Sequence, residues 1–549
     1  MFIESNKESQ RGLFSSPETF LAGKAGDFYQ KTDAWHNLFR GQVTMRIDET
    51  IFKPLFSKGI GAPNVSVRVL IGMMILKEAN GWSDAQLFEQ CRYNMLVRSA
   101  LGVMNINDPV PTESTYYLFR KRIVEYEKVE SANLIEAAFA AVTKSQAIAF
   151  EVSGRSIRMD SKLLGSNIAW LSRYELVHET LRLFCQKESL LEHPKLEEQK
   201  ELLENILKEK GNKVVYRSTS DEIQSRIVIL GRLCHKLLDI FGDLNSIQTL
   251  KRVFGEQFEI DGKKTIAAKN KTEITAQSVQ SPHDPDCHYR RKDENKVKGY
   301  SVNVIESCDR EKLNLISSVD VRQASAADND FLQGAVSQAQ KIFTEPIENA
   351  HADGAFHSVS NQEFCKKEEI NLILSAIQGA APRLCLSLSD DHELTVTDTK
   401  TNENIPVTRI KNQAKWRIRT AKGYRYFTQK EITAAELRKK IAAIPPEILN
   451  IRNNVEATIF QLGYHYPHAK SRYRGLIKHK IWANVRCLWV NFVRIVKHVG
   501  KLSENIAFCN KNKPIATFGM KISLLKTTLT VFLIKIILNK PNFHFIRCF

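Results

Sequence analysis

The sequence lacks the features that mark secreted or metal-clustered proteins. Its ten cysteines include no C-x-x-C pair, and reduced thiols in a cytoplasmic protein are the simpler expectation. The nearest approach to a metal cluster is Cys287 beside His283 and His288, in a polar, proline-containing loop where we expect no zinc site. The first ten residues contain no apolar segment, so we expect no signal peptide.

Acidic residues are almost absent from the end of the chain. Residues 457–549 contain sixteen Lys or Arg and one acid, Glu504, and they supply most of the net charge of +18. This basic balance, with a pI near 9.3, indicates nucleic acid or an anionic membrane surface as a partner. The rest of the chain is nearly neutral, and 43% of all residues are hydrophobic. The composition therefore favours a globular enzyme with a basic face over a histone-like binder.

The segment 504–549 has a composition of its own. It is rich in Lys, Asn, Ile and Phe and contains no acid after Glu504. Its most apolar part, 522–538, is interrupted by Lys526 and Lys535 and makes a poor membrane span. We expect this basic, apolar tail to be appended sequence, and we expect no membrane partner.

The first part of the chain shows only helical patterns. At 549 residues the chain is expected to form three or four units. An apolar helix is predicted over Ser66–Ala79, a capping box at Ser83–Gln86, and further short helices to about residue 145. We therefore predict an all-α N-terminal domain over 1–145. It is either a dimerisation or packing module or a helix-turn-helix reader of DNA.

The pattern changes to mixed strands and helices after residue 145. Glu151–Gly165 alternates apolar and polar residues and predicts a strand carrying Asp160, and Ile347–Phe356 predicts a strand that ends at Asp353. Between them we predict a hairpin and a helix. The expected fold is an α/β multi-domain protein with these parts: a mixed-sheet core at 146–173, 259–383 and 440–503, a helical insertion at 174–258, a β-rich insertion at 384–439, and the tail at 504–549.

A helix after Pro445 and Pro446 carries a third candidate acid. Two prolines can precede a helix and preset its first turn. Arg452 and Glu456 lie one turn apart on this helix, which by itself indicates a surface ion pair. The strongly basic sequence that follows suggests instead a carboxylate that holds metal beside a polyanion. Apolar residues recur at helical spacing and predict one buried face: Ile448, Ile451 or Val455, Ile459 and Leu462.

Cleavage of a phosphodiester with two divalent cations needs carboxylates that bridge and flank the ions. Asp160 and Asp353, at the ends of neighbouring strands, and Glu456, on a helix packed against the same sheet, fit this need. Hard Mg²⁺ or Mn²⁺ ions prefer such oxygen ligands, and we predict two ions here. Other acids near strand ends or helix starts are expected to have local roles: Asp320, Asp328 and Asp330.

Four segments carry a family resemblance, and their order is more specific than any one of them. They are Gly81–Glu89 with Asn94, Arg98 and Pro111–Tyr116; Ser281–Asp286 with Lys298–Tyr300; Ala352–Phe356; and Arg452-x-x-x-Glu456. Together they resemble a DDE transposase of a bacterial insertion sequence, with a helical N-terminal domain and a ribonuclease-H-like catalytic core. The resemblance implies that Asp160, Asp353 and Glu456 are catalytic metal ligands. It also implies that Arg452 contacts a DNA phosphate or orients Glu456.

Two positions depart from the family signature Tyr-x-x-Arg-x-x-x-Glu-x-x-x-x-x-x-Lys. Leu449 stands at the Tyr position and Gly463 at the Lys position, so a phosphate contact must come from elsewhere. The cations that follow are the candidates for DNA binding: Lys470, Arg472, Arg474 and Lys478.

The segment 464–501 is expected to form a basic amphipathic helix. Trp482, Trp489 and Phe492 alternate there with cations that include Arg486 and Arg494. Such a helix neutralises DNA phosphates with salt-sensitive affinity. Binding to a membrane surface is the alternative.

The β-rich insertion also interleaves aromatic and basic residues. Lys415 and Trp416 precede a second group, Tyr424–Phe427. This pattern suits stacking on a distorted or flipped DNA base. The alternative is that these aromatic side chains form the small core of the insertion itself.

The resemblance implies a DNA transposase that cuts the ends of an insertion sequence and joins them to target DNA. Its expected partner is double-stranded DNA, both terminal inverted repeats and target, and it is expected to act as a homodimer or higher oligomer. Two other functions stay open. One is a catalytically inactive, transposase-derived DNA-binding protein, and the other is a different ribonuclease-H-like nuclease.

Overall fold

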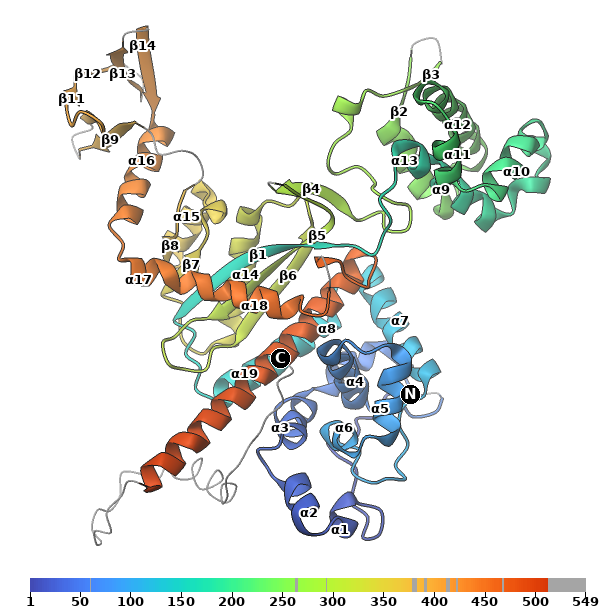
Figure 1. Ribbon diagram of the computed structural model, residues 1–549, viewed down its shortest axis with the longest axis vertical. Helices are drawn as coiled ribbons and strands as arrows, with labels where there is room; N and C mark the ends of the chain where they lie inside the picture. Colours follow the sequence, from blue (N-terminus) through green and yellow to red (C-terminus); the bar gives the residue numbers. More distant parts are fainter. Residues whose placement is uncertain are drawn as a thin grey trace.

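The computed structural model describes residues 1–59, 61–261, 265–292, 294–377, 383–389, 393–410, 415–420, 423–466 and 469–511. It shows a helical N-terminal region followed by a core built on a mixed sheet, with additional small sheets and helices (Figure 1). The predicted α/β multi-domain architecture is therefore confirmed. Within the described residues, no helix combines the length and the apolar character that a bilayer crossing needs.

The helical N-terminal region is organised around α4, which is apolar on every side. Ser66 caps its start, and nearly all of its side chains from Val67 to Leu76 are buried, as expected for a helix surrounded by others. The predicted capping box is present, since Ser83 and Gln86 each accept a hydrogen bond from the other's backbone N–H. The helices of this region are α1 (Pro17–Phe20), α2 (Gly23–Gln30), α3 (Trp35–Gln42), α4 (Val67–Asn80), α5 (Asp84–Tyr93), α6 (Met95–Ala100), α7 (Glu113–Glu130) and α8 (Leu134–Ala149), with 3-10 turns η1 (Thr44–Arg46) and η2 (Glu49–Leu55).

Gly81 ends α4 in a conformation that disfavours any other residue. Its φ is +65°, and a Cβ at this position would lie 3.1 Å from Cγ of His465. We therefore expect Gly81→Ala to lower the free energy of unfolding by about 1 kcal/mol or more. Chemical denaturation measures this change. Gly255→Ala is the matched control, because nothing lies within 4 Å of a Cβ there; an equal loss in both variants would contradict the explanation.

The core sheet has the strand order β6-β5-β1-β7-β8, with β4 pairing beside β6 on the same edge of β5. Strand β5 is antiparallel to both β1 and β6, whereas β7 and β8 run parallel to β1. The strands are β1 (Ser156–Gly165), β4 (His288–Lys292), β5 (Asn295–Ser307), β6 (Ile316–Gln323), β7 (Asn349–Ala352) and β8 (Asn371–Leu374). The helical elements after β6 and β7 are η7 (Asp328–Phe331), α14 (Leu332–Ile342), η8 (Gly354–Phe356) and α15 (Val359–Lys367).

Strand β4 lies in a stretch that the sequence predicts to be a polar loop. Its residues, HYRRK, show no apolar alternation because the strand lies at an edge and pairs with the exposed start of β5. An edge strand can be short and charged without loss of its backbone pairing.

Alternation along β1 separates the two faces of the sheet. Ile157 and Met159 point into a core shared with α14. Asp160 pairs with Val304, which belongs to the core on the other face, and cross-strand partners share a face. That second face is covered by α18 (Asn454–Leu462) and α19 (Leu476–Lys511), which Figure 1 shows crossing the sheet. Asp160 therefore lies on the α18 face.

Helix α19 is 36 residues long and joins the helical region to the core. It packs against β6 and α18 on one side and against α3, α4, α7 and α8 on the other. Its Trp482 and Phe492 are buried in the largest hydrophobic core. Arg486 donates to the carbonyl oxygens of Glu78 and Leu462. The prediction of a DNA-facing helix over 464–501 is thus wrong for Trp482, Arg486 and Phe492. Their amphipathic pattern reflects packing of α19 between the helical region and the core.

The predicted helix after Pro446 is broken in the middle. It consists of α17 (Pro446–Leu449), the 3-10 turn η9 (Asn450–Asn453) and α18. The tighter turn changes the phase of the side chains, so Ile448 is 38% exposed while Val455, Ile459 and Leu462 are buried as predicted. The turn also places Arg452 at the point where the chain bends over the sheet.

Two further units extend from the core in different directions in Figure 1. Each has its own hydrophobic cluster. The helical insertion extends beyond its predicted end at residue 258, because the hairpin of β2 and β3 packs on α12. It contains α9 (Arg173–Glu188), η3 (Leu190–Glu192), η4 (Pro194–Gln199), α10 (Lys200–Lys208), α11 (Gly211–Arg217), α12 (Ser220–Phe241), η5 (Asn245–Ile247), α13 (Gln248–Gln257), β2 (Phe258–Ile260), β3 (Ile266–Ala268) and η6 (Lys271–Glu273). The β-rich insertion contains β9 (Leu384–Leu388), β10 (Leu394–Asp398), β11 (Asn404–Ile405), β12 (Val407–Arg409), β13 (Lys415–Thr420), β14 (Gly423–Thr428) and α16 (Gln429–Ala442).

The tail predicted at 504–549 is described only in part. Residues 504–511 belong to the last turns of α19. Residues 512–549, with Lys526 and Lys535, lie outside the described residues.

Candidate active site

Asp160 on β1 and Asp353, the residue that follows β7, lie near one another because these two neighbouring strands run parallel. The register pairs Arg158 of β1 with His351 of β7, and continuing it by two residues brings Asp353 next to Asp160. Asp160 accepts a hydrogen bond of 2.8 Å from the backbone N–H of Ser161. Burial raises the pKa of Asp160, and the nearby Arg452 guanidinium opposes that rise. Asp353 follows the end of β7 and its side chain is 40% exposed.

Arg452 brings the three predicted carboxylates together. Its Nη2 lies 2.9 Å from Oδ2 of Asp160 and 3.7 Å from Oδ2 of Asp353. Its Nη1 lies 3.4 Å from Oε1 of Glu456, one helical turn further along. The guanidinium is largely buried, whereas the Glu456 side chain is 62% exposed. The site is therefore closed on the Asp160 side and open to solvent on the side of Asp353 and Glu456.

A buried carboxylate, Glu306 of β5, anchors the elements that carry this site. It is fully buried and pairs with Arg158 of β1 at 2.6 Å and with Arg494 of α19 at 2.5 Å. Thr458 of α18 donates a hydrogen bond of 2.7 Å to Oε2, the oxygen that Arg494 also contacts. Burial raises the pKa of Glu306, but the two guanidinium groups and the Thr458 hydroxyl outweigh that effect and the net shift is downward.

The same network fixes the position of Arg452. Arg158, two residues before Asp160, also donates a hydrogen bond of 3.1 Å to the carbonyl oxygen of Ile451 in η9. Thr458 lies two residues beyond Glu456 on α18. Strand β1 and α18 are thus joined by buried polar contacts immediately next to the carboxylates, which limits how far the carboxylates can separate.

The three carboxylates offer hard oxygen ligands of the kind that Mg²⁺ and Mn²⁺ prefer. In the described part of the chain, no three His, Cys, Asp or Glu side chains are grouped closely enough to hold an ion as they stand. At this site Arg452 lies among the acids and contacts each of them. Three carboxylates and one guanidinium have a formal charge of −2, an excess that a divalent cation would neutralise. The donor set therefore fits such an ion if the guanidinium moves.

Of the three other acids, two have local side-chain partners and the third is exposed. Asp328 accepts hydrogen bonds from Ser161 and Arg290 at the start of the α14 segment. Asp320 forms an ion pair of 2.8 Å with Arg322. Asp330 is exposed in the same 3-10 turn as Asp328. None of these three takes part in the contacts around Arg452.

The four cations predicted to bind DNA lie between α18 and α19 or at the start of α19. Three of them donate to backbone carbonyl oxygens: Lys470 to Ile168, Arg472 to Trp82 and Arg474 to Asn167. Each of the four residues is exposed, as is needed for contact with a polyanion: Lys470, Arg472, Arg474 and Lys478.

Trp416 does not lie where DNA could reach it. It is 3% exposed and packs with Phe427, its cross-strand partner, in the core of the β-rich insertion. The prediction of Trp416 as a DNA contact is therefore wrong, because strand alternation turns this side chain inward. Lys415 is exposed, and on the same outer face the Arg417 guanidinium lies 4.7 Å from the ring centre of Tyr424.

Two functional candidates escaped the sequence analysis. Glu306 is the one charged residue in the part of β5 from Gly299 to Ser307, which is buried throughout. A charged residue in such a segment is rarely buried without partners, which is a signal that could have pointed to it. Lys162 lies two residues beyond Asp160 on the same face of β1, and burial lowers the pKa of its ammonium group. Only the structure shows what surrounds Lys162.

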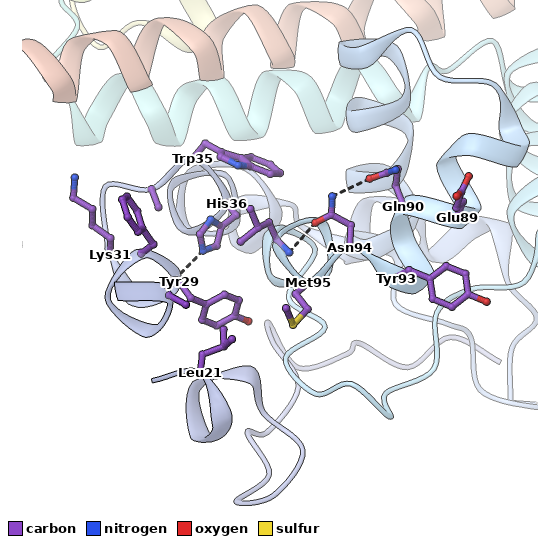
Figure 2. Close-up of a pocket in the computed structure, with 14 residues that line it drawn as sticks. Leu21, Tyr29, Lys31, Trp35, His36, Glu89, Gln90, Tyr93, Asn94 and Met95 are labelled. Atoms are coloured by element: carbon purple, nitrogen blue, oxygen red, sulfur yellow. Dashed lines mark hydrogen bonds between the residues drawn. The ribbon is translucent and has the colours of Figure 1, made fainter. Parts of the chain in front are cut away.

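A separate cavity of about 770 Å³ lies in the helical N-terminal region. Figure 2 shows Tyr29, Trp35 and His36 on one side and Tyr93 and Met95 on the other. The His36 ring nitrogen Nε2 is 2.9 Å from the carbonyl oxygen of Tyr29, and burial lowers the His36 pKa. The cavity is formed by α2, α3, α5 and α6 and shares no residue with the carboxylate site.

The helical region also holds the match to a known family. Residues 28–122 match the family described as Transposase domain (DUF772). The matched transposase domain runs from the end of α2 into α7 and supports a transposase family for the chain. A comparison with curated proteins found no match.

Several residues of the resemblance have structural roles in the transposase domain. Asn94 caps α6 by accepting from the N–H groups of Leu96 and Val97, and Thr112 caps α7. Arg98 is buried and donates to the carbonyl oxygens of Cys91, Asn105, Ile106 and Asp108. These motif residues therefore stabilise the helices and turns of the matched segment.

Proposed function

We propose that this protein is a metal-dependent DNA transposase with a ribonuclease-H-like catalytic core. The observation that carries the proposal is the meeting of Asp160, Asp353 and Glu456 around one guanidinium. They come from β1, the end of β7 and α18, in a chain whose residues 28–122 match a transposase domain. The mixed sheet and the exposed cations after α18 agree with a DNA substrate.

The carboxylates would hold two Mg²⁺ or Mn²⁺ ions. When bound, such ions activate the attacking hydroxyl and stabilise the leaving oxygen. Asp160 is fixed on β1 at the closed side of the site. Asp353 and Glu456 face solvent, so the DNA strand approaches from their side. Arg452 neutralises the acids in the absence of cations and, once displaced, is placed to contact a phosphate.

The proposed chemistry consists of two displacements at phosphorus. In the first, a water oxygen bonds to phosphorus while the bond to the 3′ oxygen breaks, and that oxygen takes up a proton to become a 3′-hydroxyl. In the second, this hydroxyl bonds to a phosphorus of target DNA and releases another 3′-hydroxyl. One phosphodiester forms as one breaks, so strand transfer needs no external energy source, and no covalent enzyme intermediate is involved. Two ends must be processed together, so a dimer or larger assembly is expected.

Arg452 competes with the cations for the same carboxylates. A positive charge about 4 Å from an ion site is worth several kcal/mol at an effective dielectric constant near 20. We therefore expect Arg452→Met to tighten Mn²⁺ binding at least about tenfold while it abolishes the ion pairs with Asp160 and Glu456. Electron paramagnetic resonance of free Mn²⁺ measures this affinity without any assay of cleavage. Arg291→Met, on the edge strand β4, is the control; equal or weaker Mn²⁺ binding by Arg452→Met would contradict the competition.

The proposal is tested with a duplex that spans the junction between the gene and its flanking DNA. With Mg²⁺, the full-length protein should nick one strand at a fixed position and leave a 3′-hydroxyl that a polymerase can extend. Chelation of Mg²⁺ should stop nicking but leave binding. Binding without nicking would instead identify a catalytically inactive DNA-binding protein. Nicking without joining to a second DNA would identify a nuclease.

A further inference from the structure

Lys162 is a cation on the face of the sheet that carries the carboxylates. It lies on β1 two residues after Asp160, and the partners of the two residues on β5 are Val302 and Val304. Residues two apart on a strand point to the same face, about 7 Å from one another. Lys162 therefore points toward α18, beside the candidate active site and beyond Asp160.

The Lys162 ammonium lies beside Gly463, the residue that follows the C-terminal end of α18. A Cβ built on Gly463 would be 3.6 Å from Nζ of Lys162. Gly463 follows Glu456 by seven residues, which is close to two turns of a helix, so the end of α18 brings Gly463 to the same side as Glu456. A glycine here leaves room for a side chain that reaches across from the sheet. The family signature has a lysine at position 463, where this chain has glycine. Lys162 of β1 brings an ammonium group close to that position.

The ammonium has no anionic partner within the described residues. The half-buried Lys162 takes part in none of the ion pairs or side-chain hydrogen bonds found there, whereas Arg452 holds the neighbouring acids. Even partial removal of an ammonium group from water without an anionic partner is unfavourable. A ligand with negative charge is the partner that would offset this cost.

We propose that Lys162 contacts a DNA phosphate, the one that adjoins the phosphate being cleaved on the same strand. This inference rests on the proposed function and deepens it by assigning the phosphate contact that α18 itself lacks. The carboxylates hold cations around the scissile phosphate, and Lys162, one step further along the same face, holds the adjoining phosphate. It is a binding residue for the substrate and not a metal ligand.

A purely structural role is the competing explanation. Gly463 follows the last residue of α18, and a cation near the C-terminus of a helix interacts favourably with the helix dipole. In that case loss of the ammonium lowers stability and leaves DNA binding unchanged. The two explanations therefore predict different measurements.

The test uses the full chain and the junction duplex described above. Lys162→Met keeps the length of the side chain and removes its charge. We expect it to reduce the slope of log K against log salt by about 0.9, the contribution of one phosphate contact, and to slow nicking about tenfold or more. Lys162→Arg should keep both properties near those of the unchanged protein. Lys208→Met, an exposed residue of the helical insertion paired with Glu204, is the control.

A relocated charge makes the test specific. The double variant Lys162→Met/Gly463→Lys puts an ammonium group back from the side of α18, where the φ of −93° is compatible with lysine. We expect it to regain the salt slope and most of the nicking rate. An unchanged slope and rate in Lys162→Met, or a loss of stability alone, would overturn the inference. Failure of the unchanged protein to bind or nick the duplex would count against the proposed function itself.

Discussion

Asp353→Asn is expected to abolish Mg²⁺-dependent nicking while DNA binding is kept. The substitution removes one negative charge and one ligand oxygen from the site but keeps the shape of the side chain. Loss of a partner in the outer shell of a metal site already costs 10- to 100-fold, so loss of a ligand should reduce the rate by more than about 100-fold. The fold should be unaffected, because Asp353 is partly exposed and its ion pair with Arg452 is a long one of 3.7 Å.

The measurement is single-turnover nicking of the junction duplex, with binding followed by gel shift on the same samples. Asp330→Asn is the matched control, because Asp330 is an exposed acid near the sheet that does not contact Arg452. We expect the control to nick at the rate of the unchanged protein. Nicking retained by Asp353→Asn, or lost equally in both variants, would contradict the assignment of Asp353.

Glu306→Ala is expected to be the most destabilising single change in the core. It leaves the guanidinium groups of Arg158 and Arg494 without their buried partner and removes the acceptor of Thr458. Breaking a buried ion pair by removing one member typically costs 3–5 kcal/mol, so we expect a loss of about that size in the free energy of unfolding. Urea denaturation followed by circular dichroism measures it.

Glu204→Ala provides the comparison for a surface pair. Its ion pair with Lys208 is exposed, and the change should cost less than about 1 kcal/mol. The pH dependence of the free energy of unfolding should also distinguish Glu306 from a surface residue. The pKa of Glu306 is lowered in the folded protein, so its stabilising effect is present above the unfolded pKa and is lost as the pH falls through the folded value. A similar loss in both variants at neutral pH would contradict the anchoring role of Glu306.

The positions of the two aspartates could be predicted because local patterns determine them. Alternation locates the strand that carries Asp160, and a strand followed by glycine places Asp353 directly after β7. The prediction that Asp160 ends its strand is wrong, because β1 continues to Gly165. Parallel pairing then brings the end of β7 beside the middle of β1, as the register of the two strands shows. The capping box at Ser83 was predictable for the same reason, since it depends on residues three apart.

Other features depend on contacts between distant parts of the chain. Of the partners of Arg452, only Glu456 is near it in the sequence. Asp160 lies 292 residues away, so the spacing of residues along the chain does not predict this contact. The basic pattern of α19 looks like a surface helix, yet Arg486 and Arg494 are held internally. Trp416 looks like a stacking residue, yet one strand register turns it into the core. In each case the packing partner, and not the local pattern, decides which way the side chain points.

The central claim is that Asp160, Asp353 and Glu456 together hold the divalent cations, and the binding of Mn²⁺ tests it most directly. Electron paramagnetic resonance can count the Mn²⁺ ions bound per chain in the presence of the junction duplex. We expect two ions for the unchanged protein and for Asp330→Asn. We expect neither ion to bind tightly when Asp160→Asn and Asp353→Asn are combined. Retention of both ions by the combined variant would contradict the account.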